Sequence, residues 1–537
     1  AIFGKTPKMM DFFSRKFNYP FPWEKYAQVV VRDYTSGAME NTGATVMMGG
    51  VQVNKRSIAD HNWEELIAHE LIHQWFGDLV TAESWANLTL NEAFGSYGEY
   101  LWLEEEYGKD QAAYWWQEEL ADYFDEAVTK REPIIRYRHL DKEEMFDSHT
   151  YAKGALVLHM LRDYVGDEAF FEAISQYLKQ NEFKSAEIHT LRLAFEKVTG
   201  EDLNWFFDQW FLFAGHPELT VTKDYKDGVL TLDITQEQDP KYTPIYRLPL
   251  HVSIWVNGIE RIYPITIIQD EQQFNFPVKA EPDLVVFDSH IQLLAQVNLD
   301  KSDEEWLFQL KYANDYLSRL AAVSALHENI TKPDVSEGVF ALLSDKFWAT
   351  RMMALRAYTD FQGENKEKII EKIKQMAITD KNSSVRASAV DVLSSLGSFR
   401  ELLDKTLQDS SYFVISNSLY AYAALEGITE EEVLAQMKKF EHMDERHVVY
   451  TLADAYSSFL TPDKYDWFET KLSKKSGDEL AYLLNQFEAY IQKQDEPTKQ
   501  KAMKFLANLA KYDNNYEIRQ NTYQTILIMG EIEGRET

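Results

Sequence analysis

The sequence predicts a multidomain, mainly α-helical protein with an α/β domain at residues 1–217, a small β-sandwich at 218–299 and an α-helical array at 300–537. The chain has 537 residues, which at roughly 150 residues per domain suggests three or four domains. The spacing of the apolar residues changes from helical to alternating near residue 219 and returns to helical near residue 300. With 45% hydrophobic residues, the chain can bury several cores.

The first domain begins with two short strands and continues mainly as helices. Residues 28–31 (QVVV) and 45–48 (TVMM) are β-branched or apolar, so we expect strands on either side of a glycine-bearing turn. After Asn62 the apolar residues recur at helical spacing. The sequence Gly-His-Pro at 215–217 marks the end of this domain.

The second domain shows the period of two that is typical of strands. Turn sequences separate the runs at Asp227-Gly228 and Asn257-Gly258. The alternating runs are 219–221, 229–234 and 250–256. This pattern predicts a small all-β module that ends near Val297.

The third domain contains similar helical segments. Each has a basic residue followed by a small and apolar face; they are 319–326 (RLAAVSAL), 351–358 (RMMALRAY) and 386–393 (RASAVDVL), with a weaker fourth at 416–423. The first three segments are spaced by 32 and 35 residues. Helical pairs at a spacing of this size indicate a HEAT-like or armadillo-like array, in which small residues allow close stacking. An irregular helical bundle is the alternative.

Composition excludes several functions. The 55 basic and 87 acidic residues give a net charge of −32, which would repel nucleic acids and anionic membranes. The chain has no cysteine, so disulfides, thiolate zinc sites and cysteine nucleophiles are absent. No apolar run reaches the roughly 20 residues of a membrane span, so we expect a soluble protein. The compartment stays open between cytoplasmic and, if an upstream signal has been removed, secreted or periplasmic; the oligomeric state also stays open.

The strongest chemical signal is the sequence His69-Glu70-Leu71-Ile72-His73, an H-E-x-x-H motif. Residues four apart lie on one face of a helix, so both imidazoles can bind one zinc ion. Glu70 lies about 100° around the helix and can reach a water molecule at that ion. Chance would produce such a motif in only a small fraction of chains with this composition.

A hydrolytic zinc site needs a third protein ligand and an open position. Glu92 is the candidate, nineteen residues after His73. Gly77 can end the first helix, and a returning helix would bring Glu92 back to the histidines. The alternative is a solvated carboxylate at a helix start, favoured by the helix dipole. Spacing alone does not decide between the two.

The motif Gly37-Ala38-Met39-Glu40-Asn41 precedes the H-E-x-x-H motif and its distant glutamate. Together these features resemble the zinc aminopeptidases of the aminopeptidase N family, which are gluzincins and include leukotriene A4 hydrolase. Further segments that resemble this family are 73–81 (HQWFGDLVT), 90–92 (LNE), 151–155 (YAKGA), 207–210 (FDQW) and 215–217 (GHP). The resemblance covers most of residues 1–217 and implies a thermolysin-like catalytic domain.

The resemblance also implies a role for each motif. One zinc ion per chain would be bound by His69, His73 and Glu92. Glu70 would be the general base, and Tyr151 would stabilise the oxyanion.

For substrate binding, the resemblance implies that the N-terminal amine of a peptide is held by the motif that ends at Asn41. The groups that hold it would be Glu40 and the backbone of Gly37, Ala38 and Met39. Glu99, two helical turns after Glu92, would orient a ligand histidine, although an exposed helix carboxylate is the alternative. Lys153 and the aromatic run 114–116 are interpreted as structural.

The chain differs from the family at three places. Ala93 replaces the usual glycine and Gly95 a frequent alanine, and we expect both changes to be tolerated. Family members normally begin with an all-β domain of about two hundred residues, so we expect an N-terminal domain to be missing here. The alternative functions are a bifunctional epoxide hydrolase and aminopeptidase of the leukotriene A4 hydrolase type, and a truncated inactive form that acts as a binding scaffold.

Overall fold

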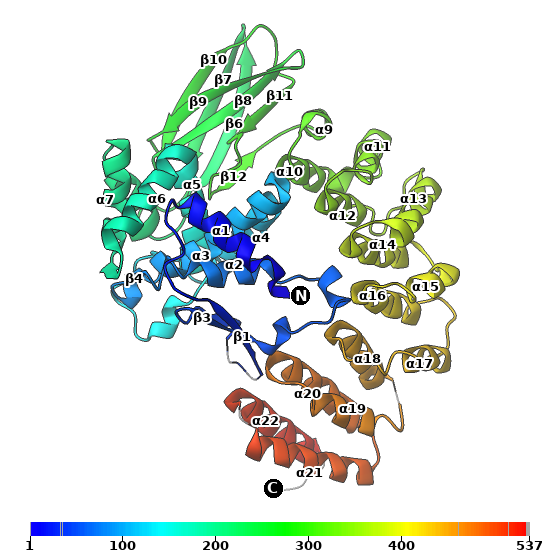
Figure 1. Ribbon diagram of the computed structural model, residues 1–537. Coiled ribbons are helices and arrows are strands. Elements are labelled where there is room, and N and C mark those ends of the chain that lie inside the picture. Colours follow the sequence, from blue (N-terminus) through cyan, green and yellow to red (C-terminus); the bar gives the residue numbers. More distant parts are fainter. Residues whose placement is uncertain (1, 33, 35, 460, 514, 533–537) are drawn as a thin grey trace.

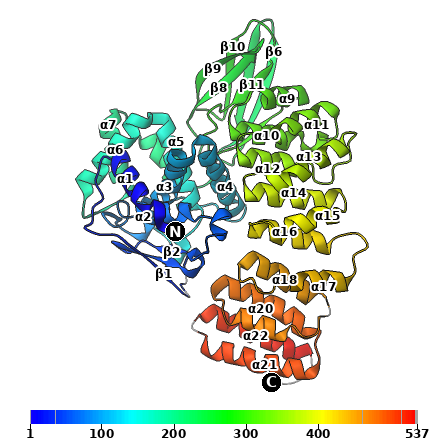
Figure 2. The same ribbon diagram turned by 45° about the vertical axis from the view of Figure 1, so that its right-hand side comes forward.

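The computed structural model describes residues 2–532 except 33, 35, 460 and 514. It is mostly α-helical and has three consecutive parts (Figure 1). A mixed part comes first, two β-sheets follow it, and the remaining helices form an arc beside the mixed part (Figures 1 and 2).

The mixed part contains eight α-helices and five short strands among its described residues. The helices are α1 (Thr6–Lys16), α2 (Glu64–Ile72), α3 (Thr89–Tyr107), α4 (Lys109–Ala127), α5 (Gly154–Val165), α6 (Asp167–Asn181), α7 (Ile188–Thr199) and α8 (Asn204–Phe207). The strands are β1 (Ala27–Val31), β2 (Ala38–Met39), β3 (Ala44–Met48), β4 (Val80–Ala82) and β5 (Lys184–Ala186). Shorter helical turns are η1 (Ile2–Lys5), η2 (Gly49–Val51), η3 (Ser57–Ala59), η4 (Trp85–Asn87), η5 (Lys142–Met145), η6 (His149–Lys153) and η7 (Asp208–Leu212).

The first sheet contains both strands that the sequence predicts. These strands, β1 and β3, pair in parallel, with Ala27 opposite Ala44. Parallel neighbours cannot be joined by a tight turn, because the chain must return to the starting edge. The intervening segment supplies β2, which pairs antiparallel with β3, and then turns at Gly43, whose φ is +69°. The sheet order is β1-β3-β2, so β2 lies at an edge.

Small residues let three helices of the mixed part pack unusually close. A β-carbon at Gly98 of α3 would lie 2.8 Å from a side-chain carbon of Ile72 in α2. A β-carbon at Gly154, the first residue of α5, would lie 2.6 Å from that of Ala93 in α3. Since β-carbons do not approach this closely, α2 and α5 both depend on glycine to contact α3.

Residues 218–299 form two sheets around one apolar core. A four-stranded sheet has the order β10-β7-β6-β12, and a three-stranded sheet has the order β11-β8-β9. Residues that alternate along the strands, such as Val221, Leu232 and Val252, are buried. The strands are β6 (Glu218–Lys226), β7 (Val229–Gln236), β8 (Leu248–Val256), β9 (Ile259–Ile267), β10 (Glu271–Pro277), β11 (Leu284–Phe287) and β12 (Gln296–Leu299).

The last part consists of stacked helices. Each of α10, α12, α14, α16, α18 and α20 contacts the helix two places further along the chain, which makes a continuous layer. The helices are α9 (Asp303–Tyr312), α10 (Tyr316–Leu326), α11 (Pro333–Leu342), α12 (Trp348–Arg356), α13 (Lys366–Thr379), α14 (Ser383–Leu396), α15 (Arg400–Thr406), α16 (Tyr412–Ala423), α17 (Glu430–Lys438), α18 (Arg446–Ser458), α19 (Tyr465–Leu472), α20 (Gly477–Gln492), α21 (Glu496–Tyr512) and α22 (Tyr516–Ile532), with η8 (His327–Asn329).

The basic residue of each repeat has a structural role. Arg319, Arg351 and Arg386 each occupy the fourth position of a helix in this layer. Each arginine donates to an aspartate that lies three residues before the next helix of the layer. The partners are Asp345 at 2.7 Å, Asp380 at 2.6 Å and Asp409 at 2.9 Å. All six side chains are at least four-fifths buried. These ion pairs therefore join successive repeats.

The helical arc contacts the mixed part at two places. Near α4, the indole nitrogen of Trp348 donates to Gln111. Further along, the backbone nitrogen of Tyr412 donates to Asp60, and Arg56 donates to the carbonyl of Asp409. Among the described helices, none combines the length and the apolar character needed to cross a membrane.

Candidate metal centre and active site

Helix α2 presents the H-E-x-x-H motif inside the mixed part. His69 and Glu70 lie on its last turns, and His73 is the first residue after it, still in a helical conformation. The side chains of the two histidines therefore project on one side of the helix. Their rings are 4.8 Å apart, and both residues are buried.

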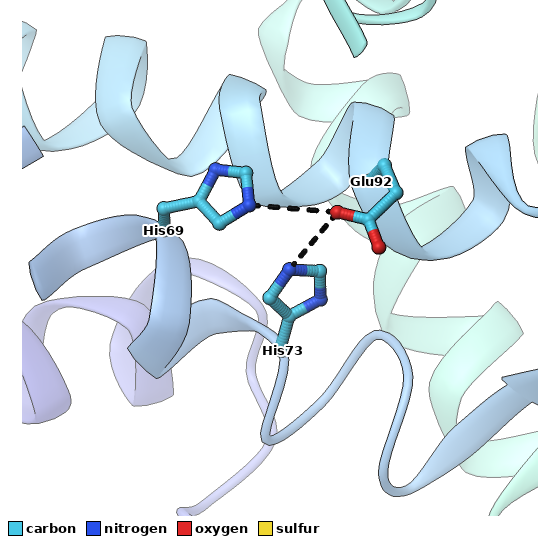
Figure 3. A group of neighbouring side chains, drawn as sticks. All are labelled: His69, His73 and Glu92. Carbon is cyan, nitrogen blue, oxygen red and sulfur yellow. Dashed lines mark ion pairs between the residues drawn. The ribbon is translucent and has the colours of Figure 1, made fainter. Parts of the chain in front are cut away.

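Helix α3 brings Glu92 to the two histidines, as the sequence predicts. The Nε2 atoms of His69 and His73 each lie 3.5 Å from the same carboxylate oxygen, Oε2 of Glu92 (Figure 3). Burial alone would raise the pKa of Glu92, but the neighbouring His73 and His69 lower it well below its ordinary value. Glu92 is thus an ionised buried carboxylate and not a solvated helix-start residue.

The arrangement of these three residues fits a zinc ion. Two ligands of a tetrahedral zinc ion, each about 2.0 to 2.1 Å from the metal, are separated by roughly 3.3 Å, close to the separations seen here. The Nδ1 atom of His73 lies 2.9 Å from the carbonyl oxygen of Phe76, to which it can donate. Such a bond leaves Nε2 with the lone pair that a metal requires.

Glu99 holds the other histidine. Its Oε1 lies 2.8 Å from Nδ1 of His69, and its Oε2 accepts a hydrogen bond from the indole nitrogen of Trp115. The Glu99 side chain is only 18% exposed, so it is not the exposed helix carboxylate of the alternative reading. Trp115 belongs to the aromatic run 114–116 and is buried in the core, as expected, and its indole nitrogen additionally holds Glu99.

Glu70 provides a carboxylate next to the candidate metal ligands. Its Oε2 is buried and has no hydrogen-bond partner among the described residues. Burial raises the pKa of Glu70 to about 7, although His69 and His73 act in the opposite direction. A buried oxygen without a partner is costly, which indicates that a water molecule or substrate group belongs beside it.

Tyr151 approaches from a third element, the single π-helical turn η6. Its ring stacks near that of His69, with 6.1 Å between ring centroids. Burial raises the pKa of Tyr151 far above its ordinary value, and Glu92 raises it further, so the hydroxyl keeps its proton. The hydroxyl of Thr89, at the start of α3, donates to the carbonyl of Thr150 and fixes this turn beside Glu92.

The segment 37–41 lies next to the same centre. Its strand β2 ends at Met39, and Glu40 follows directly. Glu40 raises the pKa of Glu70 and of Tyr151 through its charge, which places the carboxylate near both groups. Because β2 lies at the edge of its sheet, one side of its backbone is available to an extended peptide.

Gln74 is a residue that the sequence did not single out. It follows His73, and its side-chain nitrogen donates to the carbonyl of Glu40 at 3.0 Å. Its side-chain oxygen accepts from the backbone nitrogen of Gly43 at 2.8 Å. Gln74 is completely buried. It therefore fastens the segment 37–41 to the helix that carries the metal ligands.

A comparison with family models matches residues 2–210 to the peptidase family M1 domain. The match contains all the residues of the centre described above. This part of the chain is therefore similar to the peptidase family M1 domain.

Named relatives agree with the M1 assignment. The chain is 36% identical to aminopeptidase N of Streptomyces lividans over 253 residues, 45% of this chain and 29% of that protein. It is 28% identical to the tricorn protease-interacting factor F2 of Thermoplasma volcanium over 344 residues, 63% of this chain and 41% of that protein. The chain thus spans less than half the length of these curated relatives.

A solved structure extends the likeness beyond the M1 domain. Aminopeptidase A of Legionella pneumophila, solved in complex with aspartic acid, has a TM-score of 0.61 and 17% identity, covering 98% of this chain and 73% of that chain. At this identity the likeness shows a shared fold, which includes the two sheets and the helical arc.

The two small differences from the M1 pattern have distinct surroundings. Ala93 fits because its neighbour is Gly154, which leaves space for the methyl group. A β-carbon at Gly95 would lie 2.7 Å from ring atoms of His69 and 2.8 Å from Nε2 of His73. The imidazoles therefore lie directly against the backbone of α3, and an alanine at position 95 would require them to shift.

Lys153, in the same turn as Tyr151, points away from the centre. Its amine is completely buried and donates to the carbonyl of Gly215 at 2.8 Å. Burial lowers the pKa of Lys153 to about 7, and the charge of Arg136 lowers it further. The side chain connects the π-helical turn to the end of the M1 domain, in agreement with its structural interpretation.

Proposed function

We propose that this protein is a zinc-dependent aminopeptidase that hydrolyses the N-terminal peptide bond of peptides. His69, His73 and Glu92 would hold one zinc ion per chain. The observation that carries the proposal is the meeting of three metal-ligand side chains with Glu70, whose buried oxygen has no partner among the described residues. Similarity to the M1 domain and the aminopeptidase names of relatives support the same conclusion.

A bound zinc ion would act as a Lewis acid and lower the pKa of water from about 15.7 towards 7. Glu70 would accept a proton from the attacking water and return it to the leaving amine. Its burial suits this task, because a carboxylate whose pKa lies near neutrality can both accept and donate a proton.

Tyr151 would donate a hydrogen bond to the carbonyl oxygen as negative charge develops there. Its hydroxyl remains protonated, and it lies beside His69, where the scissile carbonyl must bind. Loss of one such donor typically costs about 2.7 to 4 kcal/mol of transition-state stabilisation.

The amine of the substrate would bind to Glu40, and its backbone would extend along β2. A fixed carboxylate recognises a protonated amine by a charge-assisted hydrogen bond. The net charge of −32 favours a cationic end and disfavours nucleic acid. The expected substrates are therefore peptides with a free N-terminal amine.

The division of the chain belongs to the same proposal. We assign a thermolysin-like catalytic domain to residues 1–217, a β-sandwich domain to 218–299 and a HEAT-like domain to 300–537. This division is supported by β6, which begins at Glu218, by β12, which ends at Leu299, and by the repeated ion pairs of the helical layer.

The test compares an aminoacyl amide with its N-acetylated form and uses Glu70→Gln as the main variant. The wild type should cleave only the aminoacyl amide whose amine is free. Glu70→Gln should keep its zinc and lose about 100-fold or more of kcat. Glu105→Gln, on an exposed position of α3, is the matched control and should behave as wild type. Equal cleavage of both substrates, or retained turnover in Glu70→Gln, would reject the proposal.

A further inference from the structure

A second group of potential metal ligands lies away from the centre described above. Asp163 is near the end of α5, His251 is in β8, and His290 is in the segment after β11. One ring nitrogen of each histidine and one carboxylate oxygen of Asp163 lie within 4.8 Å of one another. The group connects the M1 domain to the β-sheets.

The contacts within this group are short. Nδ1 of His290 lies 3.0 Å from Oδ1 of Asp163, and the rings of His251 and His290 stack with their centroids 4.1 Å apart.

The surroundings contain polar atoms without partners. Nδ1 of His251, Oγ of Ser289 and Oε1 of Gln292 are all buried, and none has a hydrogen-bond partner among the described residues. Two of these residues flank His290 in sequence. Buried polar atoms normally have partners, and unpaired ones of this kind suit a ligand or its bound water.

Another group of similar composition differs because its charged side chains are already paired with other side chains. Glu126, Asp147 and His149 also lie within 4.8 Å of one another. There, however, Arg136 and Lys130 pair with Asp147, and Glu126 accepts from His149. The charge of Asp147 is already compensated. By contrast, among the described residues Asp163 pairs only with His290.

We propose that Asp163, His251 and His290 form a second zinc site, separate from the catalytic centre. Two imidazoles and a carboxylate are a donor set that zinc accepts, with water in the remaining position. The His290 and Asp163 side chains are 38% and 34% exposed, so an ion can enter from solvent and the side chains can turn towards it.

The position of the site defines its effect. A metal bound there would link α5, which begins directly after the turn carrying Tyr151, to strand β8 of the neighbouring sheets. Binding to the folded chain stabilises it by mass action. Zinc at this site would therefore strengthen the attachment of the sheets to the M1 domain without contributing to the chemistry.

The test measures bound zinc by equilibrium dialysis of the metal-free full chain against zinc chloride, followed by elemental analysis. The wild type should bind two equivalents of zinc and His290→Ala one. The thermal stabilisation that comes from zinc at the second site should be lost in His290→Ala. His442→Ala, which removes an exposed histidine of the helical arc, is the matched control and should bind two. Asp163→Asn should reproduce the loss with a different side chain.

A catalytic-site variant separates this proposal from the proposed function. The double variant His69→Ala/His73→Ala should retain one equivalent, and addition of His290→Ala should remove it. If the catalytic centre bound no zinc, the wild type would bind one equivalent and His290→Ala none, which would still support the second site. Equal zinc content of the wild type and His290→Ala would overturn it.

Discussion

Glu99 offers a sharp test of how the metal centre is supported. The carboxylate contacts His69 and Trp115 and lies outside the set of direct ligands. The substitution Glu99→Gln preserves size and one oxygen acceptor but removes the negative charge that faces Nδ1 of His69. We expect weaker zinc binding, because the imidazole then loses the partner that fixes its orientation and increases its basicity.

The magnitude follows from the contact. The 2.8 Å contact joins side chains that are only 11% and 18% exposed, so water cannot replace it easily. A hydrogen bond to a charged group contributes about 1.5 to 3 kcal/mol, and each 1.4 kcal/mol changes an equilibrium constant tenfold. Zinc affinity should therefore fall by about 10- to 100-fold in Glu99→Gln.

The assay is competition for zinc between the metal-free protein and a chelator of known affinity. Glu105→Gln serves as the control, because Glu105 lies on the same helix but is exposed. It should leave the zinc affinity unchanged. If Glu99→Gln binds zinc as tightly as the control, then Glu99 does not support His69 and the reasoning from this contact is wrong.

Three further predictions concern stability. Arg351→Ala should lower the free energy of unfolding of the helical arc by about 3 kcal/mol or more, measured by urea denaturation. Arg400→Ala, in an ion pair about half exposed, should cost much less, and equal losses would contradict the burial argument. Lys153→Met should stabilise the protein most below pH 7, and the gain should shrink from pH 7 towards 10.5, because the folded wild type loses a proton that the unfolded chain retains; a difference in urea midpoint that does not vary with pH would contradict this. Gly154→Ala should cost about 1 to 3 kcal/mol and lower Tm, because its β-carbon would lie 2.6 Å from a carbon of α3, while Gly4→Ala, with open space around it, should leave Tm unchanged.

Local sequence patterns predicted the parts of the centre that depend on helix geometry. His69 and His73 are four residues apart, so any helix through them places both on one face, and Glu92 needed only a returning helix. The basic residue of each repeat was also visible in the sequence. Its partner was not, because the aspartate that pairs with Arg351 lies 29 residues further along the chain.

The features that were missed depend on contacts between distant segments. The parallel pairing of β1 and β3 cannot be inferred from two apolar runs, since either direction gives the same pattern. Gln74 looks like any polar residue after a helix until the segment at Glu40 and Gly43 lies beside it. In the same way, His251 and His290 carry no spacing signal, because one comes from β8 and the other from the segment after β11.

The hydrogen bonds of Gln74 have a consequence for the choice of peptide bond. Through this side chain, the backbone of Glu40 is joined to the residue next to a metal ligand. On the proposed function, Glu40 binds the substrate amine and the metal centre hydrolyses the peptide bond. The Gln74 contacts would hold these two sites at a fixed separation. On that proposal the fixed separation would suit release of one residue at a time, because a peptide bond further inside the substrate could reach the metal only if the amine left its site empty.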